Sequence, residues 1–308
     1  MKLTSIIPHS ILLVLTPLIL YVLMITVSND VSEYEIIWGL LQNISLSEAS
    51  SSLRYEQGSL FVLWGFAGLV SSSTSFYLVG TLALSIKYYL FNRYLNNPLI
   101  AYFLYLITFV HILDANQIRV ALSVCILFYA LFVSPASKYT YLWLTLVAVL
   151  FHYSGVIILF LYFVRWPIVP LVAVIFGSLV FDKVIMSTDY LNFARIWLAS
   201  GDGKVNLTNS FFIMQVFIFI VCAVNWKSLS EGQRRGALLN MVGVVIYISF
   251  LDNPIVAHRL RELSQLGIFP ILFLGARYLT FPKLVTSICF CYIVFYNLLL
   301  IFLELMQI

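Results

Sequence analysis

The sequence has little charge. Only 10% of its 308 residues are Asp, Glu, Lys or Arg, whereas 62% are hydrophobic, and the mean hydropathy is +1.01. A soluble domain carries about 25% charged residues, so this scarcity excludes an ordinary soluble globular protein and predicts a polytopic membrane protein. The net charge of +4 is modest and indicates no nucleic-acid partner.

Signatures of cofactor and metal binding are also missing. The sequence has no glycine-rich nucleotide-binding loop, no His-Glu-x-x-His motif and no Cys/His spacing typical of zinc sites. The cysteines all fall within apolar runs, which favours buried or lipid-facing thiols over disulfides and metal ligands; they are Cys125, Cys222, Cys289 and Cys291. No pair of acids resembles a metal clamp. We therefore expect no cofactor, no metal and no soluble nucleotide-sugar domain.

The apolar runs predict an all-α protein with about 11 transmembrane helices, within a range of about 10–12, in a single integral membrane domain over residues 1–308. The predicted spans are 6–27, 76–91, 99–113, 119–134, 139–151, 154–165, 167–181, 210–226, 237–251, 263–280 and 284–305. Leu60–Val70 is short and serines follow it, so we expect it only to dip into the bilayer. The two runs around His152 are shorter than the ~20 residues of a normal span. They are either half-helices that meet at a broken midpoint or steep spans across a thin membrane.

The distribution of basic residues orients the chain. With the N-terminus in the cytoplasm, most basic residues lie on the inner side and all acids except Glu231 lie outside, as the positive-inside rule expects. The inner basic residues are then Lys2, Lys87, Arg93, Lys138, Arg165, Lys227, Arg234, Arg235, Arg277 and Lys283. The polar segments 28–58 and 182–209 become extracytoplasmic loops, each with an interfacial helix.

Arg119 stands at the start of a predicted span, close in sequence to Asp114 and Gln117. A guanidinium presents a planar fork of donors that suits phosphate. Ionisable groups at the ends of spans are either water-exposed anchors or parts of a lined site. We expect Arg119 to bind an anionic group, with Asp114 and Gln117 orienting it. The alternative is a salt bridge from Arg119 to Asp114 that only closes the loop.

His152 ends one apolar run, and Ser154 and Gly155 begin the next. An imidazole at this position can act as an acid, a base or a donor to phosphate near neutral pH. Alternatively, it only donates to a backbone carbonyl that the helix break leaves unpaired.

A second group of candidates follows Asn253–Pro254, which breaks the chain before a predicted helix with His258, Arg259 and Arg261. Arginines near a helix N-terminus oppose the helix dipole unless an anion is bound there. We therefore expect these residues to bind an anion. The alternative is a solvated helix start in which Arg259 pairs with Glu262, three residues later.

Further candidates lie in the predicted outer loops. Arg54, Tyr55 and Glu56 precede the dipping helix, where Tyr55 is placed to stack on a sugar and Glu56 to act as a base or hold a hydroxyl. The alternative is an interfacial tyrosine beside a solvated glutamate. Arg195 lies in a predicted surface helix of the 182–209 segment, which is either a lid or a membrane anchor.

Four short motifs, taken in order, resemble those of the EpsG-like family of polysaccharide polymerases, relatives of the Wzy-type O-antigen polymerases. They are Tyr55-Glu56-x-Gly58, Asn116-x-x-Arg119-x-Ala121-Leu122, Phe151-His152-x-Ser154 and Arg259-Leu260. The resemblance implies a glycosyltransferase of the bacterial inner membrane that acts at its outer face on undecaprenyl-pyrophosphate-linked oligosaccharides. It also implies an architecture similar to the multi-span, lipid-sugar-dependent (GT-C-like) glycosyltransferases. Membrane lipids and a chain-length regulator are the implied partners.

On this expectation, the growing glycan leaves its polyprenyl pyrophosphate as a sugar hydroxyl of the incoming repeat unit attacks. Arg119 and Arg259, supported by Arg261, would bind the pyrophosphate, and His152 or Glu56 would act as the base. The product is an O-antigen or an exopolysaccharide. The rival functions are a flippase of lipid-linked oligosaccharides, a membrane O-acyltransferase and a purely structural scaffold.

Overall fold

We describe a computed structural model of the chain, covering residues 15–24, 31–53, 56–67, 69–115, 118–133, 137–187, 205–251, 253–275 and 280–305. These ranges contain helices, turns and no strand, which confirms the all-α prediction. The helices after Leu15–Met24 are α2 (Val31–Leu41), α3 (Leu46–Ser52), α4 (Gln57–Ala67), α5 (Ser72–Tyr94), α6 (Pro98–Thr108), η1 (Val110–Ala115), α7 (Ile118–Phe132), α8 (Lys138–Phe151), η2 (Tyr153–Arg165), α9 (Ile168–Ser187), α11 (Ser210–Val224), η4 (Trp226–Ser228), α12 (Glu231–Ser249), α13 (Pro254–Gln265), α14 (Ile268–Phe273) and α15 (Phe281–Leu305).

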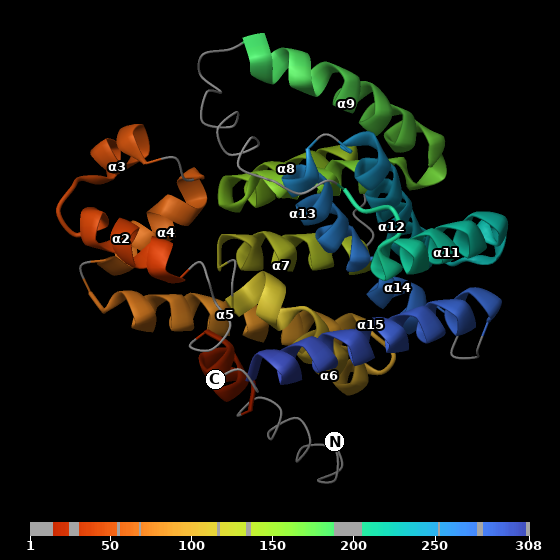
Figure 1. Cartoon of the computed structure of the whole chain (residues 1–308), viewed down its shortest axis with the longest axis horizontal. Coiled ribbons are helices and arrows are strands. Elements are labelled where there is room, and N and C mark those ends of the chain that lie inside the picture. Colours follow the sequence, from red (N-terminus) through yellow and green to blue (C-terminus); the bar gives the residue numbers. More distant parts are fainter. Residues whose placement is uncertain are drawn as a thin grey trace. The chain divides into compact units, whose positions relative to one another are not determined.

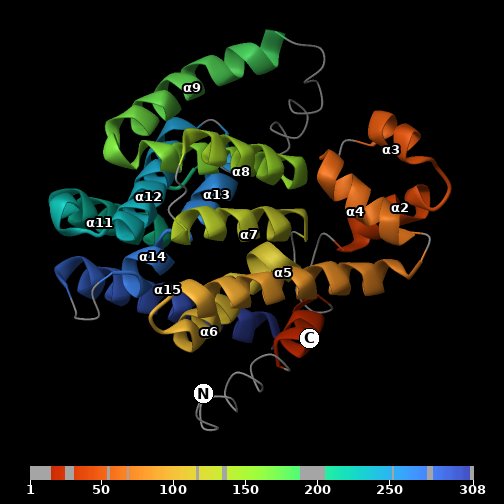
Figure 2. The ribbon, with the colours of Figure 1, turned by 180° about the vertical axis from the view of Figure 1, so that it is seen from behind.

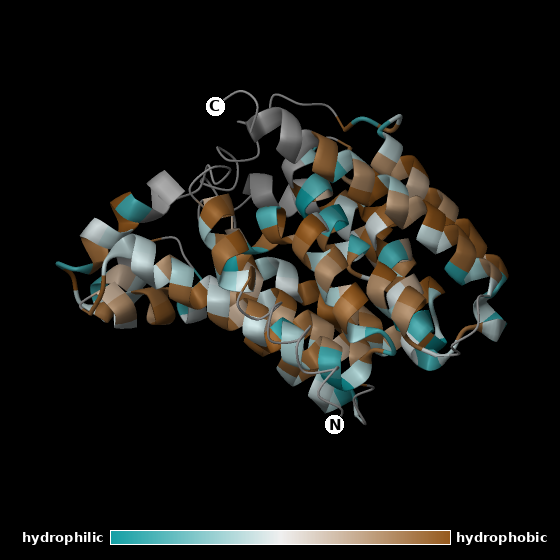
Figure 3. Cartoon of the chain, turned by 90° about the horizontal axis from the view of Figure 1, so that it is seen from below, coloured by the Kyte–Doolittle hydropathy of each residue, from teal (hydrophilic) through white to brown (hydrophobic). Residues whose placement is uncertain are grey.

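Apolar residues, brown in Figure 3, recur along almost every described helix. Among these helices, Phe281–Leu299 within α15 is the one that is long and apolar enough to cross a membrane. The shorter apolar helices have 10–17 residues; as α-helices they are about 15–26 Å long, below the ~30 Å of a bilayer's hydrocarbon core. Most predicted spans therefore coincide with a helix, and the number of crossings stays a prediction.

The predicted span 263–280 is wrong as a continuous helix. The chain instead breaks after Gln265, and the short helix α14 ends at Phe273. The break allows a close backbone approach, because a Cβ on Gly236 of α12 would lie 2.3 Å from the carbonyl oxygen of Gly267. Two glycines thus let the α13–α14 junction press against α12, as small residues do where membrane helices pack closely.

The short runs on either side of His152 form a helical hairpin. A Cβ on Gly155 would lie 2.6 Å from Cβ of Ala148, and the rings of Tyr141 and Tyr162 are 6.1 Å apart. Both pairs fit the register of two antiparallel arms, α8 and η2. This excludes half-helices that meet end to end. The second arm, η2, has 13 residues in 3₁₀ conformation and a kink at Phe163, whose backbone angles (φ −84°, ψ 20°) are not helical.

The chain forms two compact units. The first comprises residues 1–130, 142–156 and 292–308. Figures 1 and 2 show α2, α3 and α4 grouped at one end of α5, and α2 and α4 both contact α5. Buried Trp38 and Phe76 join α2 to α5, with their ring centroids 5.7 Å apart.

At the start of α3, Glu48 accepts hydrogen bonds from the N–H and hydroxyl of Ser45, which lowers the pKa of the Glu48 carboxyl group.

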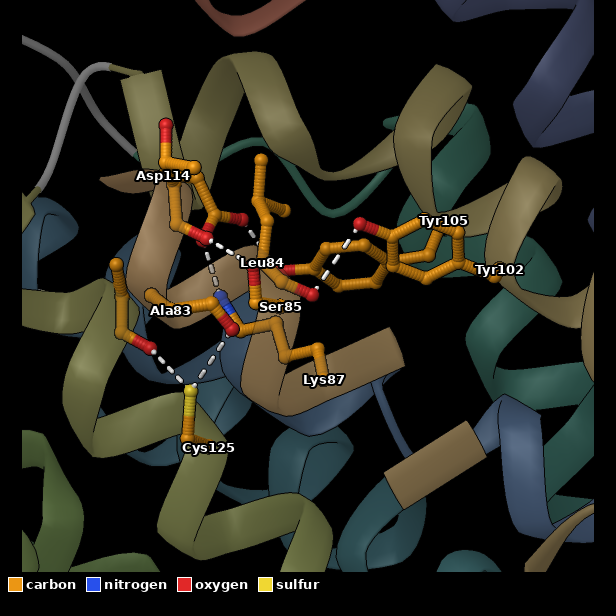
Figure 4. A network of polar contacts seen from close by, with 10 residues as sticks. Ala83, Leu84, Ser85, Lys87, Tyr102, Tyr105, Asp114 and Cys125 are labelled. Carbon is orange, nitrogen blue, oxygen red and sulfur yellow. Dashed lines mark hydrogen bonds and ion pairs between the residues drawn. The ribbon is translucent and has the colours of Figure 1, made fainter. Parts of the chain in front are cut away.

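The core of this unit contains a buried ion pair between Lys87 of α5 and Asp114 of η1 (Figure 4). Both side chains are 0% exposed. The Tyr105 hydroxyl donates to the other carboxylate oxygen of Asp114 at 2.6 Å. The Lys87 ammonium also lies 5.2 Å from the centre of the Tyr105 ring. This arrangement neutralises both charges inside an apolar helix bundle.

This contact corrects two sequence-based expectations. The charge count assigns Lys87 to the inner surface and Asp114 to the outer one, but they lie in direct contact within the bundle. The expectation that Asp114 orients Arg119 is also wrong, because the carboxylate of Asp114 is bound by Lys87 and Tyr105. The positive-inside rule counts exposed loop charges, so a buried paired lysine should not enter it.

The second unit comprises residues 131–141 and 157–291, and α12 is its central helix. Helices α9, α11, α13 and α14 all pack against α12. Its side chains are buried along nearly the whole length from Gln233 to Tyr247. The buried Arg235 donates from Nε to the carbonyl oxygen of Leu131 at 3.0 Å, which ties the start of the unit to α12.

The buried pair predicts the effect of Asp114→Asn. Removing one partner leaves the Lys87 charge buried and unpaired, so the free energy of unfolding should fall by about 3–5 kcal/mol. Thermal unfolding of the purified protein in detergent measures this loss. The double variant Lys87→Met/Asp114→Asn removes the stranded charge and keeps an acceptor for Tyr105, so it should recover most of the stability. Unchanged unfolding of Asp114→Asn would contradict the structural role of the pair.

Candidate functional site

Glu56, Arg119 and His152 come together in the first unit, although 96 residues separate the first from the last. Oε2 of Glu56 is 2.9 Å from Nη1 of Arg119, and Oε1 is 3.9 Å from Nε2 of His152. The backbone N–H of Tyr153 also donates to Oε1 at 3.4 Å. One carboxylate therefore connects the start of α4, the start of α7 and the turn between α8 and η2.

The start of α4 is held against the end of α8 by close backbone contact. A Cβ on Gly58 would lie 2.8 Å from the carbonyl oxygen of Leu150, so only glycine fits without a shift. The hydroxyl of Ser59 donates to the carbonyl oxygen of Phe151 at 2.6 Å, which satisfies one of the carbonyls that a helix C-terminus leaves unpaired. These two contacts place Glu56 directly beside the turn at His152.

His152 lies between the last residue of α8 and the first of η2, and its ring is fixed by Ser154. The backbone N–H of Ser154 donates to Nδ1 of His152 at 3.2 Å, and the Ser154 hydroxyl lies 2.6 Å from the same atom. Because Nδ1 accepts the backbone N–H, we assign the ring proton to Nε2. That N–H lies on the side of the ring nearest to the Glu56 carboxylate.

Exposure differs sharply within this cluster. The Glu56 side chain is 2% exposed, whereas those of Arg119 and His152 are 26% and 23% exposed. The negative charge of Glu56 thus lies below the protein surface, whereas the side chains of Arg119 and His152 are partly exposed at it. A buried carboxylate that fixes two exposed donor groups leaves a surface suited to an anion with several oxygens.

A second candidate group lies on α13 in the second unit. Arg261 is 5% exposed, its guanidinium carbon is 5.0 Å from the centre of the Tyr247 ring, and Tyr247 also contacts the His258 ring at 5.2 Å. Among the described residues, Nε and Nη1 of Arg261 are buried without a hydrogen-bond partner. A buried cation is costly unless it is paired, so this guanidinium is a candidate ligand for an anion.

The sequence-based argument for α13 needs two corrections. The helix begins at Pro254, so Arg259 and Arg261 lie beyond its first turn, where the dipole effect is confined. The ion pair between Arg259 and Glu262, which belongs to the alternative interpretation, is not formed among the described contacts. Sequence spacing allows such a pair but does not require it, because side-chain packing decides the rotamers.

Several predicted residues lie outside the part of the chain that the structure describes. They are Arg54, Tyr55, Asn116, Gln117 and Arg195. Other contributors were missed by the sequence reasoning: the Ser59 hydroxyl and the Tyr153 backbone N–H. A glycine two residues after Glu56 is the one signal in the sequence that points to close packing there.

No group of three His, Cys, Asp or Glu residues among the described residues is placed to hold a metal ion. The Glu56–Arg119–His152 cluster itself offers hydrogen bonding, charge stabilisation and proton transfer by side chains.

The tight contact at Gly58 predicts that Gly58→Ala destabilises the first unit. The added Cβ forces α4 away from Leu150, so the Ser59 and Glu56 contacts lengthen and the free energy of unfolding falls by about 1–3 kcal/mol. Gly65→Ala on the same helix is the matched control, because its Cβ meets nothing within 4 Å. There the gain in helix propensity should leave stability unchanged or slightly higher. Equal thermal unfolding of the two variants would contradict the proposed close approach.

Comparison with known proteins identifies one family for this chain. The model of the EpsG family matches residues 9–307, which is nearly the whole chain. Comparisons with curated proteins and with solved structures give no significant match.

Proposed function

The chain belongs to the EpsG family, and from this premise we propose that it is a glycosyltransferase that polymerises lipid-linked oligosaccharides. The family and the apolar helices together indicate a membrane protein with a polymerase-type function in polysaccharide biosynthesis. The proposed substrates are a glycan on polyprenyl pyrophosphate and a lipid-linked repeat unit. The product is an O-antigen or an exopolysaccharide chain longer by one unit.

The observation that carries this proposal is the buried carboxylate of Glu56 beneath two partly exposed donors, Arg119 and His152. When a glycosyl–pyrophosphate bond breaks, negative charge develops on the leaving diphosphate. Fixed donors in a water-poor site stabilise such charge without reorganising during the reaction. The ion pair to Glu56 holds the Arg119 guanidinium in place before the substrate arrives, which is the preorganisation that this chemistry needs.

The proposed reaction has one bond exchange. The acceptor hydroxyl oxygen bonds to the anomeric carbon, the bond from that carbon to the pyrophosphate oxygen breaks, and its electron pair stays on the diphosphate. The hydroxyl proton passes to Glu56, or to Nδ1 of His152 through the Ser154 hydroxyl, which lies 2.6 Å from that nitrogen. His152 is the more accessible of the two, and Glu56 stabilises the positive charge that His152 acquires when it takes the proton.

Arg261 and Arg259 supply a second proposed anion contact, within the second unit. The buried guanidinium of Arg261, with two nitrogens unpaired among the described residues, supports this role. His258 reaches the same cluster through the Tyr247 ring. We assign this cluster to a phosphate group of the lipid-linked substrates.

The finer architecture belongs to the same proposal. It comprises about 11 spans, a GT-C-like arrangement, extracytoplasmic loops at 28–58 and 182–209, and a single integral domain in a bacterial inner membrane. The site would face the periplasmic side, with a chain-length regulator as a possible partner and no metal requirement. Polymerisation of purified lipid-linked repeat units by this protein alone, with and without chelator, tests the polymerase activity and its independence of metal. Transport of the units without polymer would instead indicate a flippase, and transfer of labelled acetyl groups an O-acyltransferase.

Arg119→Ala should reduce polymer formation by about 10²–10³-fold, the usual effect of removing one donor to a developing negative charge. Single repeat units should remain on the lipid carrier, which extraction and sizing of the lipid-linked sugars would show. Full-length polymer from this variant would remove Arg119 from the mechanism.

Two further variants separate catalysis from stability in that experiment. Arg119→Lys keeps a positive charge beside Glu56 but loses the planar fork, so it should fold normally and recover only part of the activity. Arg93→Ala removes an exposed arginine near the end of α5 and should leave polymer length unchanged.

Substitutions by glutamine decide which group accepts the proton. His152→Gln keeps an N–H donor but no basic nitrogen, so polymer formation should fall by about 10²-fold or more if His152 is the base. Glu56→Gln keeps the shape of the side chain but loses the negative charge that fixes Arg119. Both the substrate affinity and the rate of polymer formation should therefore fall. Normal kcat in His152→Gln together with complete loss in Glu56→Gln would assign the base to Glu56.

A further inference from the structure

A pocket of about 270 Å³ lies in the second unit. It is lined by residues from the start of α8, the end of η2 and the start of α12. Its lining comprises Ser137, Lys138, Tyr141, Tyr162, Val164, Arg165, Trp166 and Glu231. We call it the Lys138–Arg165 pocket. Lys138 is the first residue of α8, and His152 follows its last residue. None of the residues proposed for glycosyl transfer lines this pocket.

The pocket carries uncompensated positive charge. Glu231, its one acidic lining residue, pairs with the buried Arg235 beneath it at 3.3 Å. Among the described residues, Lys138 and Arg165 have no ion-pair partner, and the Lys138 ammonium lies 5.2 Å from the centre of the Tyr139 ring. Two cations at one cavity, with the local acid already neutralised, favour an anionic occupant.

The start of α8 adds to this preference. Ser137 caps the helix by accepting the backbone N–H of Thr140 at 3.3 Å, and both Ser137 and Lys138 line the pocket. The first N–H groups of a 14-residue helix thus lie at the pocket, where the helix dipole favours negative charge. Hydrogen-bond donors from Lys138, Arg165 and the helix terminus match the oxygens of a phosphate group.

The surroundings of the pocket favour a phosphate that belongs to a lipid. Tyr141, Tyr162 and Trp166 supply aromatic walls, and aromatic residues typically lie at the headgroup level of a bilayer. Helix α9 begins two residues after Trp166 and exposes a run of apolar side chains, along which an acyl chain can lie; they are Ile168, Val172, Ile175, Phe176 and Leu179. The volume is below the ~300–1,000 Å³ of sites for drug-sized ligands, which fits a headgroup better than a sugar chain.

We propose that the Lys138–Arg165 pocket binds the phosphate of an anionic phospholipid headgroup. Basic pockets between membrane helices on the cytoplasmic side are sites of this kind, and the charge distribution of the sequence predicts that this end of the hairpin faces the cytoplasm. The site is separate from the proposed polymerase chemistry. Its role is to hold the end of the α8–η2 hairpin opposite His152 at the level of the lipid headgroups.

Native mass spectrometry of the purified full-length protein, titrated with short-chain phosphatidylglycerol, tests this proposal. Phosphatidylcholine with the same chains and inorganic phosphate are the comparison probes. The variant Lys138→Gln/Arg165→Gln should bind phosphatidylglycerol about tenfold or more weakly than the unmodified protein. Arg93→Gln/Lys227→Gln is the matched control, because it removes the same charge from exposed residues outside the pocket. It should bind like the unmodified protein.

The outcomes separate the two sources of phosphate. Loss of phosphatidylglycerol binding in the pocket variant alone supports the lipid site. Binding of inorganic phosphate that is lost in the pocket variant, with no such change for phosphatidylglycerol, overturns the lipid assignment and leaves a site for free phosphate. Equal affinities of the pocket variant and the control for both probes overturn the site itself. Should the double variant fail to fold, Arg165→Gln alone should show a smaller loss in the same direction.

Discussion

The carboxylate of Glu56 is the interaction on which the arrangement of the candidate site depends. It is buried, and it contacts groups from two distant segments: the guanidinium of Arg119 at 2.9 Å, and the Tyr153 N–H and the His152 ring at 3.4 and 3.9 Å. A buried carboxylate is tolerated only when its oxygens are paired. Its need for partners therefore fixes where α7 begins and where the α8–η2 turn lies. Gly58 permits this, because a larger residue would keep α4 from reaching Leu150.

Two charged clusters in the same unit differ in a way that separates structural from functional roles. In the Lys87–Asp114 pair both side chains are 0% exposed, and Tyr105 completes the bonding of the carboxylate. Such a pair is closed to ligands and supports packing within the bundle. In the Glu56 cluster only the acid is buried, while Arg119 and His152 each remain about a quarter exposed. Asymmetric burial of this kind leaves donors exposed, which is why the Glu56 cluster, and not the Lys87–Asp114 pair, is the candidate site.

The sequence alone predicts the helical class and most helix positions, and it identifies Glu56, Arg119 and His152 individually as candidate site residues. It does not predict that Glu56 contacts both others, because the contacts depend on how α4, α7 and α8 pack and no local spacing encodes this. For Lys87 the sequence predicts the wrong location, because hydropathy and charge counting assign a lysine in an apolar helix to the membrane surface. Its partner Asp114 lies 27 residues away, on a π-helical segment that sequence patterns do not reveal. The break before Gly267 has a local signal, Pro270, whereas the close approach of Gly267 to Gly236 depends on how α12 and the α13–α14 junction pack.

The lengths of the hairpin arms bear on how it can span a bilayer. As an α-helix, α8 reaches about 21 Å, and η2, which has 13 residues and a kink at Phe163, reaches at most about 26 Å. Both fall short of the ~30 Å hydrocarbon thickness, so a crossing requires local thinning or long flanking side chains that extend to the headgroups. Lys138 and Arg165, at the outer ends of the two arms, are side chains of that type. At the other end the turn carries only His152, Tyr153 and Ser154, so a crossing hairpin would hold the His152 end close to the apolar layer. On the proposed function, a lipid-linked pyrophosphate would reach that level without leaving the membrane, and the low dielectric there would strengthen its attraction to Arg119.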